Sequence, residues 1–375
     1  MKQRLALRIL AQLMGWSDQV AQREFAWLKL MSRLKYDSYQ GYLAGVRFVE
    51  SLVVWLEQIE ASERQAAYDL VRRQLVFVST LEMRRLVERF YPREVEPRLV
   101  KEAAVQCSMP PYLVWSNKAA SQLVSNLRRK TLFIGLSDGA RMDVFRRANT
   151  GLISNEQTVL APLIDRDKWL DLGKELERDL PSDPSGAKPK FTHVYLIDDL
   201  TASGTTLIRY NAEKKLWKGK LKKFREAIGA ARDALHDDFP LDAEFTLCVH
   251  HYIATQAALD GVKALCAQAA AELKEEWFPR IEFSCGLLLG PSATLASGDP
   301  FEAIAQKYYD DELENRHTAE SGVKEMHFGY KSGRLTVILE HNTPNNSISL
   351  LWAETAGSNG KHAMRALFRR QTRHV

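Results

Sequence analysis

The distribution of apolar residues divides the chain into two regions. Within residues 1–105 apolar side chains recur three and four positions apart, as in AQREFAWLKLMSRLKY and GYLAGVRFVESLVVWLEQIEA. This spacing predicts amphipathic helices, and a small winged-helix fold is compatible with it. LVFVS is ambiguous between helix and strand. The segment SMPPYLVWS, residues 108–116, breaks the pattern and marks the expected domain boundary.

Beyond this segment, short apolar runs alternate with helical patterns. KTLFIGLSDGARMDVFRRA and FTHVYLIDDLTASGTTLIRY each predict a strand, a loop and a helix. AEFTLCVHHYIAT and QAALDGVKALCAQAAAEL predict a third strand and helix, and RIEFSCGLLLG predicts a fourth strand. The alternation predicts an α/β fold, a parallel sheet flanked by helices with ligand loops at its carboxyl edge. We therefore expect a helical domain over 1–115 and an α/β domain over 116–375.

Three segments of the second region do not fit the alternation. Residues 150–190 are long and polar and predict a flexible loop. Residues 211–224, NAEKKLWKGKLKKF, read as a basic insertion. Residues 320–375 contain the strand pattern LTVILE, the loop HNTPNN, a further strand-like run and a basic tail.

Composition narrows the class of protein. The 52 Lys and Arg residues exceed the 47 Asp and Glu residues, for a net charge of +5, which permits a polyanionic ligand without requiring one. No apolar run reaches the roughly 18 residues of a membrane span, so we expect no membrane partner. Arg4 and Arg8 interrupt the apolar start, which reads as a helix and not a signal peptide. Four widely spaced cysteines give no metal or disulfide pattern and fit the cytoplasm.

The most informative stretch is VYLIDDLTASGTT, residues 194–206. Two adjacent carboxylates, Asp198 and Asp199, repel each other and suit a core poorly. At the carboxyl end of a strand they can accept hydrogen bonds from a polyol or help to organise a metal-bound ligand. Small and hydroxylated residues follow where a helix is expected to begin, which is typical of a monophosphate cradle: Ala202, Ser203, Gly204, Thr205 and Thr206.

Together these features describe a site for a ribose 5-phosphate. The alternative is that the aspartates cap a turn and that SGTT only starts a helix. The stretch resembles the phosphoribosyl pyrophosphate (PRPP) motif of type I phosphoribosyltransferases, although Thr201 replaces a usual aliphatic residue. The resemblance implies a type I phosphoribosyltransferase-like fold with a hood-like segment at 320–375. It assigns the ribose hydroxyls and catalysis to Asp198 and Asp199, the 5-phosphate to residues 202–206, and Mg²⁺ as the companion of PRPP.

The same resemblance assigns pyrophosphate to the loop after the first strand of the sheet. In LFIGLSDGAR the residues at that place are Ser137, Asp138, Gly139, Ala140 and Arg141. Gly139 offers backbone freedom and Arg141 a bidentate phosphate contact, whereas the acid Asp138 departs from expectation. The alternative is that Ser137 or Asp138 simply caps the following helix.

Two further segments offer contacts to a base or an acceptor. SNEQ supplies Asn155 and Glu156 at the start of the polar segment 150–190, in catalytic or structural roles. HNTPNN supplies His341 and Asn342, either for reading a base edge or for an Asx-turn network that fixes the loop. The residues do not decide between these alternatives.

The whole chain resembles phosphoribosyltransferase-like proteins of prokaryotic anti-phage defence systems, including those that accompany some retrons. The strings LFIGLSDGARMDVFRR, SNEQ, LIDDLTASGTT and HNTPNNSISLLW carry this resemblance. It implies an antiviral defence role with other defence proteins as partners, and it leaves open whether the chain is an active transferase. The alternatives are a catalytically inactive nucleotide-sensing module, or a nucleic-acid-binding component that uses KKLWKGKLKK around Trp217.

Overall fold

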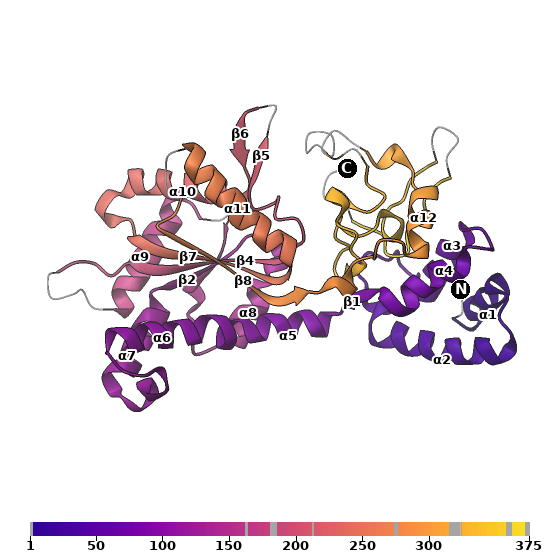
Figure 1. The fold of residues 1–375 in the computed structure, drawn as a ribbon. Coiled ribbons are helices and arrows are strands. Elements are labelled where there is room, and N and C mark those ends of the chain that lie inside the picture. Colours follow the sequence, from indigo (N-terminus) through magenta and orange to yellow (C-terminus); the bar gives the residue numbers. More distant parts are fainter. Residues whose placement is uncertain are drawn as a thin grey trace. The chain divides into compact units, whose positions relative to one another are not determined.

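The computed structural model describes residues 3–161, 164–180, 186–211, 214–273, 277–314, 323, 325–357 and 362–371. These residues form two compact units (Figure 1). The sheet unit comprises Arg84–Leu288, and the terminal unit combines Met1–Met83 with Leu289–Val375. The helix α5 (Thr80–Phe90) crosses from the terminal unit into the sheet unit.

The sheet unit is built on a five-stranded sheet of order β3-β2-β4-β7-β8. Strand β2 is parallel to both β3 and β4, and β4 is parallel to β7. The strands are β2 (Thr131–Gly135), β3 (Thr158–Leu160), β4 (Phe191–Thr201), β7 (Leu241–Thr255) and β8 (Arg280–Leu289). The predicted parallel α/β fold is confirmed, with all four anticipated strands in place.

Three helices cover one face of this sheet: α9 (Arg166–Asp179), α10 (Lys220–Leu235) and α11 (Gln256–Leu273). Alternate strand residues such as Val194 and Leu196 share a buried cluster with Trp169 of α9, Leu221 of α10 and Val262 of α11. Side chains alternate between the faces of a strand, so every second residue of β4 reaches this core. The apolar strand runs in the sequence thus reflect burial on both faces.

Aromatic rings fill the opposite face. Phe133 of β2 and Tyr195 of β4 stack with their centroids 5.6 Å apart. Phe145 of α8 (Met142–Ala148) lies 4.9 Å from Phe133. Phe90 at the end of α5 stacks on His250 of β7 at 4.1 Å. The helices α6 (Glu96–Gln106) and α7 (Lys118–Arg129) lie on the other side of the sheet from α10 and α11 (Figure 1).

The terminal unit joins the two ends of the chain in one core. Its elements are α1 (Gln3–Met14), α2 (Asp18–Leu34), α3 (Phe48–Glu57), α4 (Arg64–Asp69), β1 (Val76–Val78), α12 (Pro300–Lys307) and β9 (Val337–Leu339). β1, which is the ambiguous LVFVS, pairs in parallel with β9. The indole of Trp55 donates to the carbonyl oxygen of Leu350 at 2.7 Å. Among the described residues 3–115, β1 is the one strand, so a winged-helix hairpin is not formed there.

The units divide the chain at different places from the expected boundary near 116. Helix α6 belongs to the sheet unit, and two of its charged side chains contact strands of the sheet. Arg98 forms an ion pair with Glu282 of β8, and Glu102 lies 3.0 Å from the imidazole of His193 at the start of β4. The helices predicted within residues 84–105 are present, but periodicity does not reveal which core a helix joins.

Two other expectations need correction. The segment 150–190 is not one long loop, because it contains β3 and α9, and Trp169 of α9 is buried. The strand-like run after HNTPNN forms the 3₁₀ turn Ser349–Leu351. Residues of 320–375 that are described pack with the N-terminal helices, so this segment belongs to the terminal unit.

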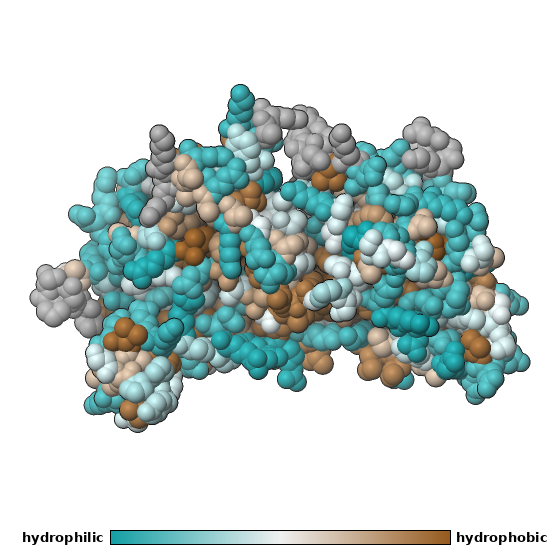
Figure 2. All heavy atoms as spheres, in the orientation of Figure 1, coloured by the Kyte–Doolittle hydropathy of each residue, from teal (hydrophilic) through white to brown (hydrophobic). Residues whose placement is uncertain are grey.

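No helix in the described ranges is long and apolar enough to cross a membrane. On the face drawn in Figure 2 hydrophilic residues predominate, and hydrophobic residues form scattered patches.

Candidate functional site

Asp198 and Asp199 lie at the point where the order of the strands in the sheet reverses. β2 has β3 on one side and β4 on the other, so the chain leaves β2 for one neighbour and later returns on its opposite side. Ligands of open α/β sheets bind outside the carboxyl ends of the strands at such a switch point. Ser137 follows β2, and Asp198 and Asp199 lie near the end of β4, so the topology places the predicted ribose and pyrophosphate residues together.

Asp198 is buried and fully engaged. It is 5% exposed, its Oδ1 accepts a hydrogen bond from the hydroxyl of Ser137, and its Oδ2 accepts one from the ammonium of Lys220. A buried carboxylate needs such partners, because desolvation would otherwise disfavour its charge. Asp198 therefore connects the loop after β2 with the start of α10.

Asp199 lies against the loop 137–141. A Cβ atom added to Gly139 would come within 2.5 Å of Asp199 Oδ2, so the absence of a side chain at 139 permits this approach. The backbone N–H of Leu200 donates to Asp199 Oδ1 at 2.7 Å. From the buried side, the hydroxyl of Tyr252 donates to the carbonyl oxygen of Ala140 at 2.9 Å and holds the loop in place.

Ser137 does not act as the cap that the alternative expected. α8 begins at Met142 after Arg141, whose φ of 50° is left-handed, and the side chain of Ser137 does not cap the preceding 3₁₀ turn Asp138–Ala140. Ser137 uses its hydroxyl on Asp198 instead.

The loop 202–206 is compact and partly buried. Thr205 is 6% exposed, and its hydroxyl lies 3.0 Å from that of Ser203. Thr255 at the end of β7 donates its hydroxyl to the carbonyl oxygen of Ala202 at 2.8 Å. Ala202 and Ser203 are half-buried and Thr206 is exposed, so these three residues are the ones that face solvent.

The helix expected directly after this loop is absent. The chain instead forms the antiparallel hairpin β5 (Arg209–Asn211) and β6 (Leu216–Lys218), and α10 starts only at Lys220. The hairpin returns the chain to the loop, because the backbone N–H of Lys220 donates to the carbonyl oxygen of Thr206 at 3.0 Å. A helix N-terminus therefore does lie beside the loop, but it comes from later in the sequence.

The same hairpin changes the interpretation of the basic insertion. Trp217 is 3% exposed, and its indole donates to Glu272 of α11 at 3.0 Å. Lys222 is paired with Glu226 at 2.8 Å. A buried indole cannot stack on a nucleic-acid base, so the aromatic half of the nucleic-acid argument does not apply.

A buried histidine lies beside Asp198 on the neighbouring strand β7. His251 of β7 is the strand partner of Asp198 and is 2% exposed. Burial lowers the pKa of His251 to about 4, although the carboxylates of Asp198 and Asp199 act in the opposite direction. At neutral pH this imidazole adds no charge to the site.

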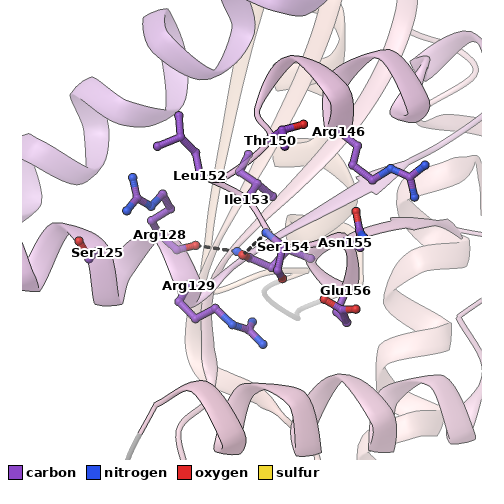
Figure 3. A pocket seen from close by; sticks show the side chains of 12 residues that line it. Ser125, Arg128, Arg129, Arg146, Thr150, Leu152, Ile153, Ser154, Asn155 and Glu156 are labelled. Carbon is purple, nitrogen blue, oxygen red and sulfur yellow. Dashed lines mark hydrogen bonds between the residues drawn. The ribbon is translucent and has the colours of Figure 1, made fainter.

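Asn155 and Glu156 lie just before β3, at the edge of the sheet where the strands begin, and the aspartates lie at the opposite, carboxyl edge. Asn155 and Glu156 line a hollow of about 560 Å³ together with Arg128 and Arg129 (Figure 3). Gln157 also lines this hollow, and its side-chain amide donates to the carbonyl oxygens of Arg128 and Thr131 at 2.7 Å each. Thr131 begins β2 and Ser137 follows its end, so at about 3.3 Å per residue the edges are more than roughly 13 Å apart. The structure does not bring Asn155 and Glu156 to the aspartates.

His341 and Asn342 belong to the terminal unit. The side chain of Asn342 donates to the carbonyl oxygen of Gln371 at 3.0 Å and accepts from the backbone N–H of Thr343 at 2.9 Å. His341 Nδ1 lies 3.7 Å from Glu340. These contacts tie the loop to the C-terminal segment, although the N–H that Asn342 accepts within the loop belongs to the next residue and not to the residue two positions on, as in an Asx-turn.

The chain is similar to a known protein family over most of its length. The PRTase-CE family matches residues 52–370. The chain belongs to the PRTase-CE family. It is therefore a phosphoribosyltransferase-like protein, and its parallel sheet with flanking helices agrees with that family. The PRTase-CE match spans the whole sheet unit and most of the terminal unit. No curated protein and no solved structure matched the chain.

Two residues at this site were not predicted from the sequence. Lys220 was part of the predicted basic insertion, yet its ammonium contacts Asp198, 22 positions away in the sequence. Thr255 ends a strand and fixes the loop at Ala202. Neither contact follows a local periodicity, so only the fold reveals it.

Proposed function

We propose that this chain binds PRPP or a related ribose 5-phosphate at the carboxyl edge of β2 and β4. Asp198 and Asp199 would accept hydrogen bonds from the ribose hydroxyls, residues 202–206 would hold the 5-phosphate, and residues 137–141 would hold pyrophosphate. The observation that carries the proposal is the contact between Ser137 and Asp198, which joins the loop of one strand to the acidic end of its neighbour at the switch point.

The residues fit a Mg²⁺ ion that arrives with the ligand. Among the described residues no group of three or more His, Cys, Asp and Glu side chains is arranged to hold a metal by itself. Mg²⁺ is commonly held by one or two carboxylates together with substrate phosphates and water. Asp199 would supply such a carboxylate, and Asp198 would supply one after it releases Ser137 or Lys220. Bound Mg²⁺ would neutralise charge on the pyrophosphate.

If the chain is an active transferase, an acceptor forms a bond to the anomeric carbon while the bond from that carbon to pyrophosphate breaks. The pyrophosphate leaves with the electron pair. The carboxylates near the ribose favour the positive charge that develops on the sugar, and the amides and Arg141 of the loop 137–141 favour the negative charge of the leaving group.

A sensing role is the second candidate, and one observation favours it. Both carboxylate oxygens of Asp198 are occupied by residues of the chain itself. A site that rests in this state is suited to respond to ligand binding by rearrangement, without any reaction. Release of pyrophosphate from PRPP in the presence of candidate acceptors would separate the transferase from the sensor.

We further propose that the protein acts in an anti-phage defence system, as an effector or an accessory component beside other defence proteins. The support is the resemblance of its motif strings to such proteins. Loss of phage resistance in cells that carry Asp199→Asn in the complete system, with unchanged protein level, would support this role. Full resistance with that variant would contradict a role for the site.

Calorimetric titration tests the binding proposal. The ligands are PRPP, ribose 5-phosphate and nucleoside monophosphates, each with and without Mg²⁺. Asp198→Asn and Asp199→Asn should each raise the Kd about 10- to 150-fold, because each weakens a charge-assisted hydrogen bond worth about 1.5–3 kcal/mol. Asp171→Asn, on the exposed surface of α9, is the matched control and should bind as wild type does. A folded wild-type chain that binds none of these ligands would refute the proposal.

A further inference from the structure

Lys220 holds a position between the two halves of the proposed site. It is the first residue of α10, and its ammonium donates to Oδ2 of Asp198. The hydroxyl of Ser137 donates to Oδ1 of the same carboxylate. A ribose hydroxyl that is to bond with Asp198 must therefore compete with a partner from the chain itself.

The backbone of Lys220 is anchored at the phosphate loop. Its N–H donates to the carbonyl oxygen of Thr206 at 3.0 Å, and the N–H of Leu221 donates to that of Leu207 at 3.0 Å. Gly219 has a φ of 129°, and a Cβ there would lie 2.2 Å from the carbonyl oxygen of Leu207, so the start of the helix is packed tightly on the loop. The side chain of Lys220 is freer, at 26% exposed on a flexible four-carbon stem.

An ammonium at this place needs an anionic partner. The first turn of α10 contains no acidic residue, and a cation there opposes the positive end of the helix dipole. Lys222 in the same turn is paired with Glu226. For Lys220 the partner is Asp198 in the ligand-free chain, and a phosphate over residues 202–206 would be a stronger one, because it carries up to two negative charges and is close to the same backbone.

We propose that Lys220 is a specificity-determining residue that makes recognition of the ribose depend on the 5-phosphate. A phosphate attracts the ammonium of Lys220 and releases Oδ2 of Asp198 for a ribose hydroxyl. A ribose without a phosphate provides no anion for Lys220, so it must displace an ion pair with a neutral hydroxyl. This inference rests on the proposed ribose 5-phosphate site.

The test compares ribose 5-phosphate with ribose by calorimetry on the full chain at one salt concentration. In Lys220→Met the affinity for ribose 5-phosphate should fall, while that for ribose should stay the same or rise, because Oδ2 of Asp198 is no longer occupied. The ratio of the two Kd values should shrink about 10- to 100-fold, as expected for loss of one charge-assisted contact. Lys222→Met removes the same charge from the same turn and should leave the ratio within about twofold.

The outcomes separate this inference from the proposed function. If wild type binds ribose 5-phosphate and Lys220→Met keeps the wild-type ratio, the role of Lys220 is refuted and the site stands. If wild type binds neither ligand, the site and the inference both fall. If Lys220→Met does not fold, Lys220→Gln takes its place, because it retains a neutral donor for Asp198. The ratio of the two Kd values should shrink in this variant as well. A parallel fall of both affinities in either variant would mark a structural role and would also refute the inference.

Discussion

Gly204 lies directly against Val262 of α11. A Cβ atom on Gly204 would come within 2.4 Å of Val262 Cγ2 and 3.1 Å of the carbonyl oxygen of Ala258. The φ of Gly204 is 73°, a left-handed conformation that side chains disfavour. The sequence places this glycine in a predicted phosphate loop, and in the structure the position that a side chain at 204 would take is occupied by α11.

Gly204→Ala should therefore destabilise the protein even without ligand. We expect a loss of about 2–4 kcal/mol in the free energy of unfolding, from backbone strain and overpacking together. Gly151 is the matched control, since its φ is 83° and a Cβ there meets nothing within 4 Å. Gly151→Ala should cost only the strain, about 1 kcal/mol. Urea denaturation measures both, and equal losses would show that Val262 does not matter.

Gly139→Ala should affect ligand binding more than stability. Its Cβ would press on Asp199 Oδ2, the far end of a side chain that can rotate away. We expect the Kd for ribose 5-phosphate to rise about tenfold, with the free energy of unfolding changed by less than about 1 kcal/mol. Gly261→Ala on α11, where a Cβ meets nothing within 4 Å, should leave the affinity unchanged. A large loss of stability in Gly139→Ala would mean that Asp199 cannot yield.

The buried histidines should make the protein less stable in mild acid. Burial lowers the pKa of His250 to about 3 and that of His251 to about 4. The unfolded chain, with a histidine pKa of about 6.5, then binds protons that the folded chain excludes. The stability from each group is complete above about pH 6.5 and is lost as the pH falls toward the folded pKa, with a slope of up to about 1.4 kcal/mol per pH unit.

His250→Asn removes one titrating group, so it should reduce this slope by up to about 1.4 kcal/mol per pH unit. The amide can still pair with Ser284, which lies 2.8 Å from His250 Nδ1, and this should preserve the fold. Denaturation at several pH values between 5 and 7 gives the slope directly. His236 is exposed, so His236→Asn is the control. A wild-type slope in His250→Asn would contradict the buried neutral state.

A fragment of residues 84–288 should fold alone, because it contains one contiguous unit with its own core. A fragment of residues 116–375, cut at the boundary that the sequence suggested, should not. It lacks Phe90 from the aromatic face, and it lacks Arg98 and Glu102, which bind Glu282 and His193. Thermal melting followed by circular dichroism distinguishes them, and a cooperative transition only in the second fragment would overturn this division.

The contacts at the candidate site span very different distances along the chain. The pairing of two acids with a small-residue loop is contained in 13 residues, 194–206, so local order identified it. The partners Ser137 and Lys220 lie 61 and 22 positions from Asp198. The sequence also predicted a helix directly after residue 206. In the structure the hairpin β5–β6 comes first and α10 begins only at Lys220, and the local pattern did not predict this hairpin.

The sequence by itself determined the alternation of strands and helices, the parallel sheet and the acidic end of β4. These follow from apolar periodicity and from residue types that act within one turn or one strand. Only the tertiary structure decided which helices share a core, where the unit boundaries lie, and which side chains meet Asp198. The indole of Trp55 bonds to Leu350 across 295 positions, and such a contact depends on chain closure and packing, which leave no periodic trace in either segment.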